Sequence, residues 1–258
     1  MTRREAIKLG IAGTVGALAL GGGLIGGTEL INKKRMKKLV IINASPRKNK
    51  NTATLLKEAQ RGAESLGAEV EFVNLIDLTF KGCMSCFACK RKGNTCNGLC
   101  AWKDDLRPVL DKILAADALV LGSPIYWSNP TGMFRNLIER LLFPMLRYDL
   151  DEKTGYTKKY LDKKMPTALV YTMNVTPEAY VKMNYDAILG PDKEHMEYYF
   201  GSCEVLRAHN TWQFPDYDKY DSSAVDVELK KWYRENQWPK DMEAAFELGK
   251  RLVNQIVQ

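Results

Sequence analysis

Short runs of consecutive apolar, largely β-branched residues alternate with amphipathic segments along most of this chain. Leu39-Val40-Ile41-Ile42 is the first such run, and residues 118–121 and 167–173 carry similar ones. A strand needs apolar residues on both sides only where helices cover both faces of its sheet, as in a parallel sheet with crossover helices. The alternation therefore predicts a doubly wound α/β domain with right-handed crossovers.

Five strands and five helices account for residues 38–258 as a single domain. We expect strands at 39–42, 70–75, 118–121, 167–173 and 204–209, and helices at 52–66, 106–116, 133–142, 177–189 and 241–257. The third strand is expected to end at Gly122-Ser123-Pro124. Residues 145–166 and 210–240 are polar or aromatic and are expected to be surface connections between these elements.

The formal charge of +7 is concentrated at the start of the chain. Residues 1–38 hold eight basic and two acidic side chains, so residues 39–258 carry a net charge of only +1. Because nucleic-acid binding depends on a basic surface, a nearly neutral body argues against DNA or RNA as a partner.

The first residues carry the pattern of an export signal. Thr2-Arg3-Arg4-Glu5-Ala6-Ile7-Lys8 precedes an uncharged stretch from Leu9 to Thr28, and the opening resembles a twin-arginine signal. We expect residues 1–28 to be this signal, residues 29–37 to be a basic linker, and the protein to be periplasmic or otherwise extracytoplasmic. A membrane anchor remains the alternative, because twenty uncharged residues can cross a bilayer and would keep the protein at the membrane.

The loop after the first strand combines hydroxyl, amide and cationic side chains just before a helix. Ser45 and Thr52 offer hydroxyl groups, Asn51 an amide, and Arg47 a cation. Free backbone N–H groups and the helix dipole favour a phosphate at such a helix start. An ordinary capped turn with exposed cations is the alternative.

Ser45-Pro46-Arg47 followed by Asn51-Thr52 resembles the phosphate loop of flavodoxin-like NAD(P)H-dependent FMN reductases and iron–sulfur flavoproteins. Residues 122–132, after the third strand, resemble the stretch that wraps the flavin ring in that family, whereas residues 173–176 match its third loop only weakly. The resemblance implies a five-stranded parallel sheet in the order 2-1-3-4-5, with FMN at the carboxyl ends of strands one and three. The flavin-binding residues that it implies are Ser45, Arg47, Asn51, Thr52, Pro124, Ile125, Tyr126, Trp127, Asn129 and Gly132.

Five of the six cysteines lie close together, spaced C-x2-C-x2-C-x6-C-x3-C from Cys83 to Cys100. Four cysteine thiolates at short intervals can hold an iron–sulfur cluster. The run resembles the compact motif of iron–sulfur flavoproteins, which bind a [4Fe–4S] cluster beside FMN, and it would form a loop over residues 81–105. Zinc, disulfides and a motif without a cluster remain alternatives.

The resemblance implies Cys83, Cys86 and Cys89 as ligands and leaves two candidates for the fourth. Cys96 keeps nearly the family distance from the third cysteine, whereas Cys100 keeps the distance to the acidic pair Asp104-Asp105. We favour Cys100 and keep Cys96 as the alternative. Cys203, which lies apart near a strand, is expected to be a buried core thiol.

The resemblance implies an FMN-dependent oxidoreductase without a catalytic side chain, because the flavin performs the redox chemistry. His195 and His209 lie far in sequence from every motif, which argues against a histidine-centred triad or metal site. A redox partner protein or a small-molecule donor or acceptor is expected, together with a homo-oligomer. Two other functions remain open: an NAD(P)H-dependent flavin, quinone or nitro reductase without a cluster, and a non-enzymatic electron carrier.

Overall fold

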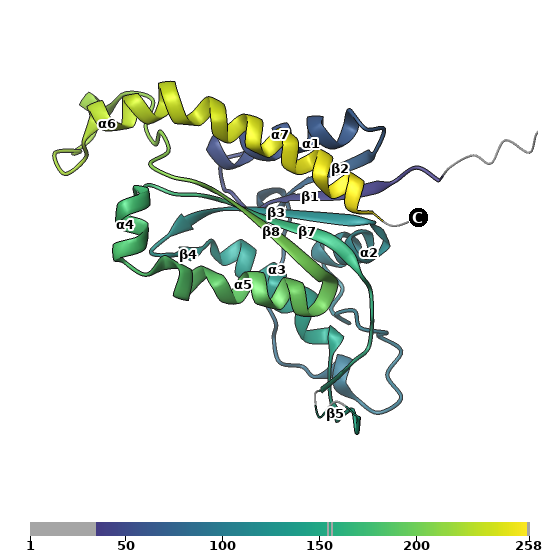
Figure 1. Ribbon diagram of the computed structural model, residues 1–258. Helices are drawn as coiled ribbons and strands as arrows, with labels where there is room; N and C mark the ends of the chain where they lie inside the picture. The colour runs from purple at the N-terminus through teal and green to yellow at the C-terminus, as the bar shows by residue number, and fades with distance from the viewer. Residues whose placement is uncertain (1–34, 154, 156, 257–258) are drawn as a thin grey trace, which may run out of the picture. The chain divides into compact units, whose positions relative to one another are not determined.

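Five parallel strands form the central sheet of the computed structural model, which describes residues 35–153, 155 and 157–256 (Figure 1). The strands are β1 (Lys38–Asn43), β2 (Glu69–Asn74), β3 (Ala118–Tyr126), β7 (Met165–Thr172) and β8 (Gly201–Ala208). Their order is β2-β1-β3-β7-β8, and every neighbouring pair is parallel. This confirms the predicted flavodoxin-like doubly wound sheet.

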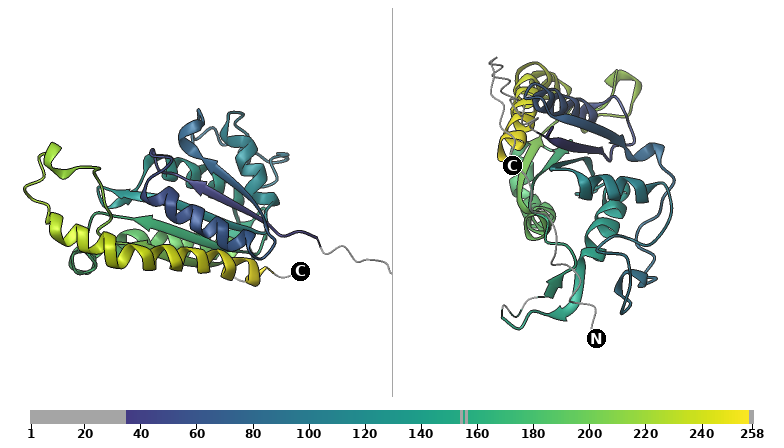
Figure 2. Two further views of the ribbon diagram at one scale, coloured as in Figure 1. Left: turned by 90° about the horizontal axis from the view of Figure 1, so that it is seen from above. Right: turned by 90° about the vertical axis from the view of Figure 1, so that its right-hand side faces the viewer.

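Helices cover both faces of the sheet. α1 (Asn51–Glu64) and α7 (Trp238–Gln255) lie on one face, and α2 (Leu106–Ala115), α3 (Gly132–Leu142) and α5 (Tyr185–Phe200) lie on the other (Figures 1 and 2). Successive residues of a strand point to opposite faces. Leu39 and Ile41 of β1 therefore pack toward α1 and α7, and Val40 and Ile42 pack toward the other helices. The three central strands read as continuous apolar runs because both of their faces are buried.

The segment from residue 177 to residue 200 differs from its prediction as one helix ending near Leu189. It forms two helices, α4 (Pro177–Lys182) and α5, separated by Asn184 in the left-handed conformation with φ 53°. Asparagine tolerates this conformation better than most residues because its short polar side chain can bond locally. α5 then continues to Phe200, with Pro191 inside it.

The two connections also contain regular structure that the polar composition did not predict. β5 (Leu146–Leu150) and β6 (Thr157–Lys159) form an antiparallel hairpin within 145–166. The second connection holds α6 (Val227–Trp232) and a π-helical turn (Tyr233–Gln237), so that helix α7 begins at Trp238.

β3 runs on to Tyr126 and turns back into β4 (Asn129–Pro130). The short 3₁₀ helices are Leu75–Asp77, Ala88–Lys90, Phe143–Met145 and Tyr217–Lys219.

The predicted signal, residues 1–28, and residues 29–34 of the predicted linker lie outside the described residues. Within the part of the chain that the structure describes, no helix is both long enough and apolar enough to span a membrane.

Helices α1 and α7 cross at two glycines. A Cβ atom added at Gly249 would stand 1.9 Å from the Ala59 carbonyl oxygen, and one at Gly62 would stand 1.9 Å from the Phe246 carbonyl oxygen. Because the nearest atoms belong to backbone, a side chain at either position must push the helices apart.

We therefore expect Gly249→Ala to lower the free energy of unfolding by about 1–3 kcal/mol, the usual cost of overpacking a tight core. Urea unfolding of the full chain measures it. Glu243→Ala on the exposed side of the same helix is the control and should stay within about 0.5 kcal/mol of wild type. Equal stabilities for the two variants would contradict the tight crossing.

Candidate functional site

A cleft lies at the carboxyl edge of the sheet, where β1, β3 and β7 end. Its lining comes from four parts of the chain: Arg47, Asn51, Pro124, Ile125, Tyr126, Thr172, Met173, Asn174, Thr211 and Gln213. The fold thus brings both predicted loops to one place, together with the weakly matching third loop. Thr211 and Gln213 were not predicted and come from the segment after β8.

The loop after β1 leaves the start of α1 open. No side chain caps this helix, and its first turn contains no acidic residue, so free backbone N–H groups remain there. The Ser45 hydroxyl is buried and accepts a hydrogen bond from the Arg47 backbone N–H (3.1 Å), which shapes the turn. An uncapped helix start beside a cation is suited to an anion.

Thr52, predicted as a phosphate donor, lies deeper than expected. Its side chain is buried, and its hydroxyl oxygen is 2.7 Å from that of Thr172. This contact joins the first turn of α1 to the end of β7. The Thr52 hydroxyl therefore holds the loop in position from the protein interior.

Residues 210–213, here called the strap, lie against the predicted phosphate loop. The Trp212 carbonyl accepts a hydrogen bond from the Asn51 side-chain amide (2.7 Å), and the Gln213 carbonyl accepts one from Arg47 (3.0 Å). On its other side the strap is held by Lys230, whose ammonium group donates to the Asn210 side-chain oxygen (2.8 Å) and to the Thr211 carbonyl (3.1 Å). No sequence motif marked this contact, because a lysine in a polar connection looks like a solvated one.

Lys230 is only 2% exposed. Burial lowers the pKa of its ammonium group to about 8, because a charge is less stable away from water. The ammonium group that holds the strap therefore loses its proton more readily than that of an ordinary lysine.

The second predicted loop is a tight hairpin between β3 and β4. Trp127 and Ser128 form its two-residue turn, with φ 48° and 65°. Glycine or asparagine usually occupies such positions, so a tryptophan there stores backbone strain. Its side chain is 98% exposed, whereas Tyr126 lines the cleft and is half-exposed. Asn129 donates to the Trp127 carbonyl (3.2 Å), which stabilises the turn.

Thr131 ties this hairpin to the first loop. Its hydroxyl donates to the Ala44 carbonyl (2.8 Å) and caps α3 by accepting from the Phe134 N–H (3.3 Å). Its backbone N–H donates to the Ser123 hydroxyl (3.0 Å). Gly132 then begins α3, which runs from the cleft toward the cysteines.

Four of the predicted cysteines line one cavity: Cys83, Cys86, Cys89 and Cys100. Cys96 is not part of this lining, and its sulfur lies 3.9 Å from the Ala88 carbonyl oxygen. The choice of Cys100 stays a prediction, with which this arrangement agrees. All six cysteines are free thiols, and among the described residues no three histidine, cysteine or acidic side chains converge closely enough to hold one metal ion.

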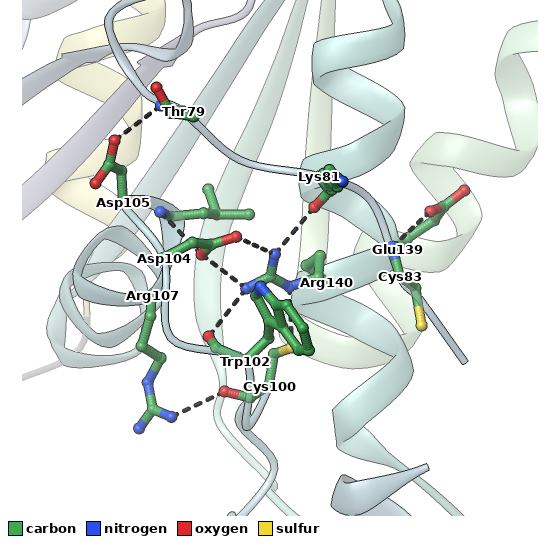
Figure 3. Close-up of polar contacts among 11 residues, drawn as sticks. Thr79, Lys81, Cys83, Cys100, Trp102, Asp104, Asp105, Arg107, Glu139 and Arg140 are labelled. Atoms are coloured by element: carbon green, nitrogen blue, oxygen red, sulfur yellow. Dashed lines mark hydrogen bonds and ion pairs between the residues drawn. The ribbon is translucent and has the colours of Figure 1, made fainter. Parts of the chain in front are cut away.

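Arg140 of α3 is the centre of a set of polar contacts beside this cavity, which Figure 3 shows. Its guanidinium donates to both carboxylate oxygens of Asp104 (2.8 and 3.0 Å), to the carbonyls of Lys81 (2.9 Å) and Trp102 (3.2 Å), and to the Cys100 sulfur (2.9 Å). Burial alone would raise the pKa of the Asp104 carboxyl, but the hydrogen bonds and charge of Arg140 outweigh it and lower that pKa. This residue was missed because one arginine on an amphipathic helix carries no motif.

The predicted acidic pair closes the cysteine loop. Asp104 pairs with Arg140, and Asp105 accepts a hydrogen bond from the Thr79 N–H (2.8 Å) at the start of the loop. Glu139 adds a third contact by accepting from the Cys83 N–H (3.1 Å). The cysteines are therefore presented by a loop fixed at both ends.

Lys90 lies beside the cysteines and holds the loop to its surroundings. Its ammonium donates to the carbonyls of Phe143 and Leu146 and lies 4.4 Å from the centre of the Phe143 ring. Burial lowers its pKa, an effect that the nearby sulfurs of Cys89 and Cys83 partly offset. Burial raises the pKa of the Cys89 thiol, and the charge of Lys90 offsets this effect only in part.

The two histidines and Cys203 lie outside the linings of the cleft and of the cysteine cavity. His195 is exposed on α5, and His209 packs edge-on against Tyr180, with 5.2 Å between ring centres. Cys203 is buried in β8, where burial raises the pKa of its thiol to about 11, as expected for a core thiol.

Comparison with known proteins places these features in context. Residues 37–173 match the family described as NADPH-dependent FMN reductase. An iron–sulfur flavoprotein of Archaeoglobus fulgidus is 43% identical over 103 residues, which is 40% of this chain and 48% of that protein. One from Methanocaldococcus jannaschii is 32% identical over 118 residues, or 46% and 58% of the two chains. The chain thus spans about half the length of these curated relatives.

Solved structures share the fold at low identity. An NAD(P)H:quinone oxidoreductase from Methanothermobacter marburgensis has a TM-score of 0.61 at 14% identity, covering 84% of this chain and 99% of that one. An FMN-dependent NADH-azoreductase from Bacillus anthracis, solved with FMN, has a TM-score of 0.56 at 14% identity, covering 84% and 100%. At this identity the likeness shows the fold.

Lys230 leads to a dependence of stability on pH. With a pKa near 8 when folded and near its ordinary value of about 10.4 when unfolded, the unfolded chain binds more protons between these values. The contribution of this group to the free energy of unfolding should therefore rise as pH increases through that window. We expect the free energy of unfolding of the wild type, relative to that of Lys230→Met, to rise by about 1–3 kcal/mol from pH 7.5 to pH 10.

Urea unfolding at the two pH values measures that difference. Lys231→Met, which alters the exposed neighbour, is the control, and its difference from wild type should not change with pH. A constant difference for both variants would mean that Lys230 titrates as an ordinary surface lysine.

Proposed function

The chain belongs to the NADPH-dependent FMN reductase family, and from that premise we propose that FMN binds in the cleft while a [4Fe–4S] cluster binds at the cysteines. The observation that supports both together is helix α3. Its first turn follows the hairpin that borders the cleft, and its last turn places Arg140 against Cys100. One rigid element thus fixes the two sites relative to each other.

The cleft fits FMN. The uncapped start of α1 offers backbone N–H groups to the phosphate, and Arg47 adds a positive charge beside them. Arg47 uses one nitrogen for the strap, so its other N–H groups remain free for a phosphate oxygen in a bidentate contact. Tyr126 provides aromatic surface in the cleft for a planar ring system, and the strap forms the outer wall. Trp127, at the tip of the adjacent hairpin, is a second exposed aromatic side chain near this site.

The cysteine cavity fits an iron–sulfur cluster. Its donors are soft thiol sulfurs, which suit iron, and the cations of Lys90 and Arg140 lie beside them. In a cubane cluster each thiolate binds a different iron, so the ligands stand further apart than around one ion. The absence of disulfides among the six cysteines gives no support to the disulfide alternative.

FMN exchanges one or two electrons when bound, and the protein orients it and shields it from water. From the cap residue Thr131 to Arg140, α3 advances about 14 Å at 1.5 Å per residue. We propose that single electrons pass between the two sites, which lie toward the two ends of this helix. We propose a redox partner protein or a small-molecule donor or acceptor as the other reactant, and a homo-oligomer as the working form, which light scattering measures.

The export prediction rests on the sequence alone. We propose that residues 1–28 direct the folded protein out of the cytoplasm, since a protein that must receive cofactors before export suits the twin-arginine route. Export that persists after Arg3 and Arg4 are both replaced by lysine would contradict this proposal.

Anaerobic purification with an absorption spectrum and counts of FMN, iron and acid-labile sulfide tests the two cofactors. We expect one FMN and about four irons and four sulfides per chain, as a cubane cluster contains. FMN without iron would support the cluster-free reductase instead. Rapid oxidation of NADPH at low concentration would exclude the non-enzymatic carrier.

Arg47→Ala tests the phosphate site. Because a hydrogen bond to a charged group contributes about 1.5–3 kcal/mol, we expect the affinity for FMN to fall at least about tenfold, whereas that for riboflavin, which lacks the phosphate, stays unchanged. Fluorescence titration of the flavin-free protein measures both. Arg61→Ala, at the opposite end of α1, is the control. An equal loss for both flavins would place Arg47 against the ring and not the phosphate.

A further inference from the structure

Every donor of the Arg140 guanidinium has an acceptor. An arginine side chain carries five N–H groups, and the structure gives this one five hydrogen-bonding contacts: two to Asp104, two to backbone carbonyls and one to the Cys100 sulfur. The side chain is 2% exposed, so it would be costly to bury without these partners. Such complete use of a planar fork indicates a site built for arginine.

The acceptors lie at the two ends of the cysteine loop. Lys81 comes two residues before Cys83, and Trp102 comes two residues after Cys100. Arg140 thus clamps both ends to α3 at once, and the neighbouring Glu139 holds the Cys83 N–H. A Cβ atom at Gly82 would stand 2.7 Å from the Glu139 carboxylate, which shows how closely the loop lies on the helix.

Cys96 is held in a different way. Its backbone N–H donates to the Asn94 side-chain oxygen (3.0 Å) and its carbonyl accepts from the Leu99 N–H (2.9 Å), so it belongs to a local turn. Its sulfur has only the distant Ala88 carbonyl as a partner, whereas the Cys100 sulfur lies 2.9 Å from the Arg140 Nε. The Cys100 sulfur therefore has a cationic hydrogen-bond donor, whereas the Cys96 sulfur does not.

We propose that Arg140 is a positioning residue that selects Cys100 over Cys96 as the fourth ligand and, through its Nε–H hydrogen bond, raises the reduction potential of the bound cluster. This inference rests on the proposed function. A hydrogen bond from a cation is strongest when the accepting sulfur carries the most negative charge. Cluster sulfurs carry the most negative charge in the reduced state, so this bond stabilises that state. Asp104 balances the charge of the guanidinium, so the cation can stay buried while its Nε is aimed at sulfur.

Arg140→Lys is the main test, because lysine keeps the charge and loses the fork. We expect a more negative reduction potential and at least a twofold loss of iron and sulfide after anaerobic reconstitution of the full chain. Arg107→Lys is the matched control, since Arg107 donates to the carbonyl of the same Cys100 (2.8 Å) and not to its sulfur. Its potential and iron content should equal those of wild type. A folded Arg140→Lys protein with wild-type potential would overturn the inference.

The ligand choice is tested by two serine variants. Cys96→Ser should keep the wild-type iron and sulfide counts, and Cys100→Ser should lose most of both. The reverse result overturns the inference. If the wild-type protein itself contains no iron, the cluster part of the proposed function fails, and the inference fails with it. Iron in wild type and equally in Cys100→Ser overturns the inference alone.

If Arg140→Lys does not fold, as judged by circular dichroism, the wild-type protein still decides the choice of ligand. Alkylation with iodoacetamide before and after removal of the cluster, mapped by mass spectrometry, identifies the cysteines that the cluster protects. We expect Cys100 to be protected and Cys96 to be labelled in the loaded protein. Protection of Cys96 with labelling of Cys100 overturns the proposal.

Discussion

The buried ion pair between Arg140 and Asp104 gives the cysteine loop its shape. Between Leu78 and Asp105 the only regular element is the short 3₁₀ helix Ala88–Lys90, so few backbone hydrogen bonds of its own order this segment. Ordering such a chain costs about 1–2 kcal/mol per residue in backbone entropy. A pair that is fully hydrogen-bonded and also fixes both ends of the loop offsets part of that cost, although a buried pair contributes little by itself.

The same helix that carries Arg140 also receives the loops of the cleft. Thr131 connects the ends of β1 and β3 through buried hydrogen bonds and caps α3, so the geometry of the sheet edge is passed along the helix. A helix is stiff over a few turns, so a displacement of its first turn also moves its last turn. The cleft and the cysteine cavity are therefore parts of one framework, although their residues lie far apart in sequence.

The sheet and the two motif loops could be predicted because they depend on local patterns. Continuous apolar runs marked β1, β3 and β7, and hydroxyl, amide and cysteine spacings marked the loops. The break at Asn184 could not be predicted, because it depends on the backbone conformation of Met183 and Asn184, and neither a glycine nor a proline stands at this point. The strap and Arg140 were missed for another reason: each acts through contacts between distant segments, and a lysine or arginine with a buried role has the same sequence appearance as a solvated one.

The crossing of α1 and α7 joins the first and the last helix of the described domain. Leu248 and Leu252 of α7 complete the core on the face that α1 begins. At about 5–20 residues per second, the ribosome needs about 10–40 seconds between making the two helices. During that time β1 and α1 expose apolar surface that no other helix covers. Under the proposal that residues 1–28 are an export signal, this signal would emerge at the beginning of that period, and export of the folded protein would have to wait until α7 has been released.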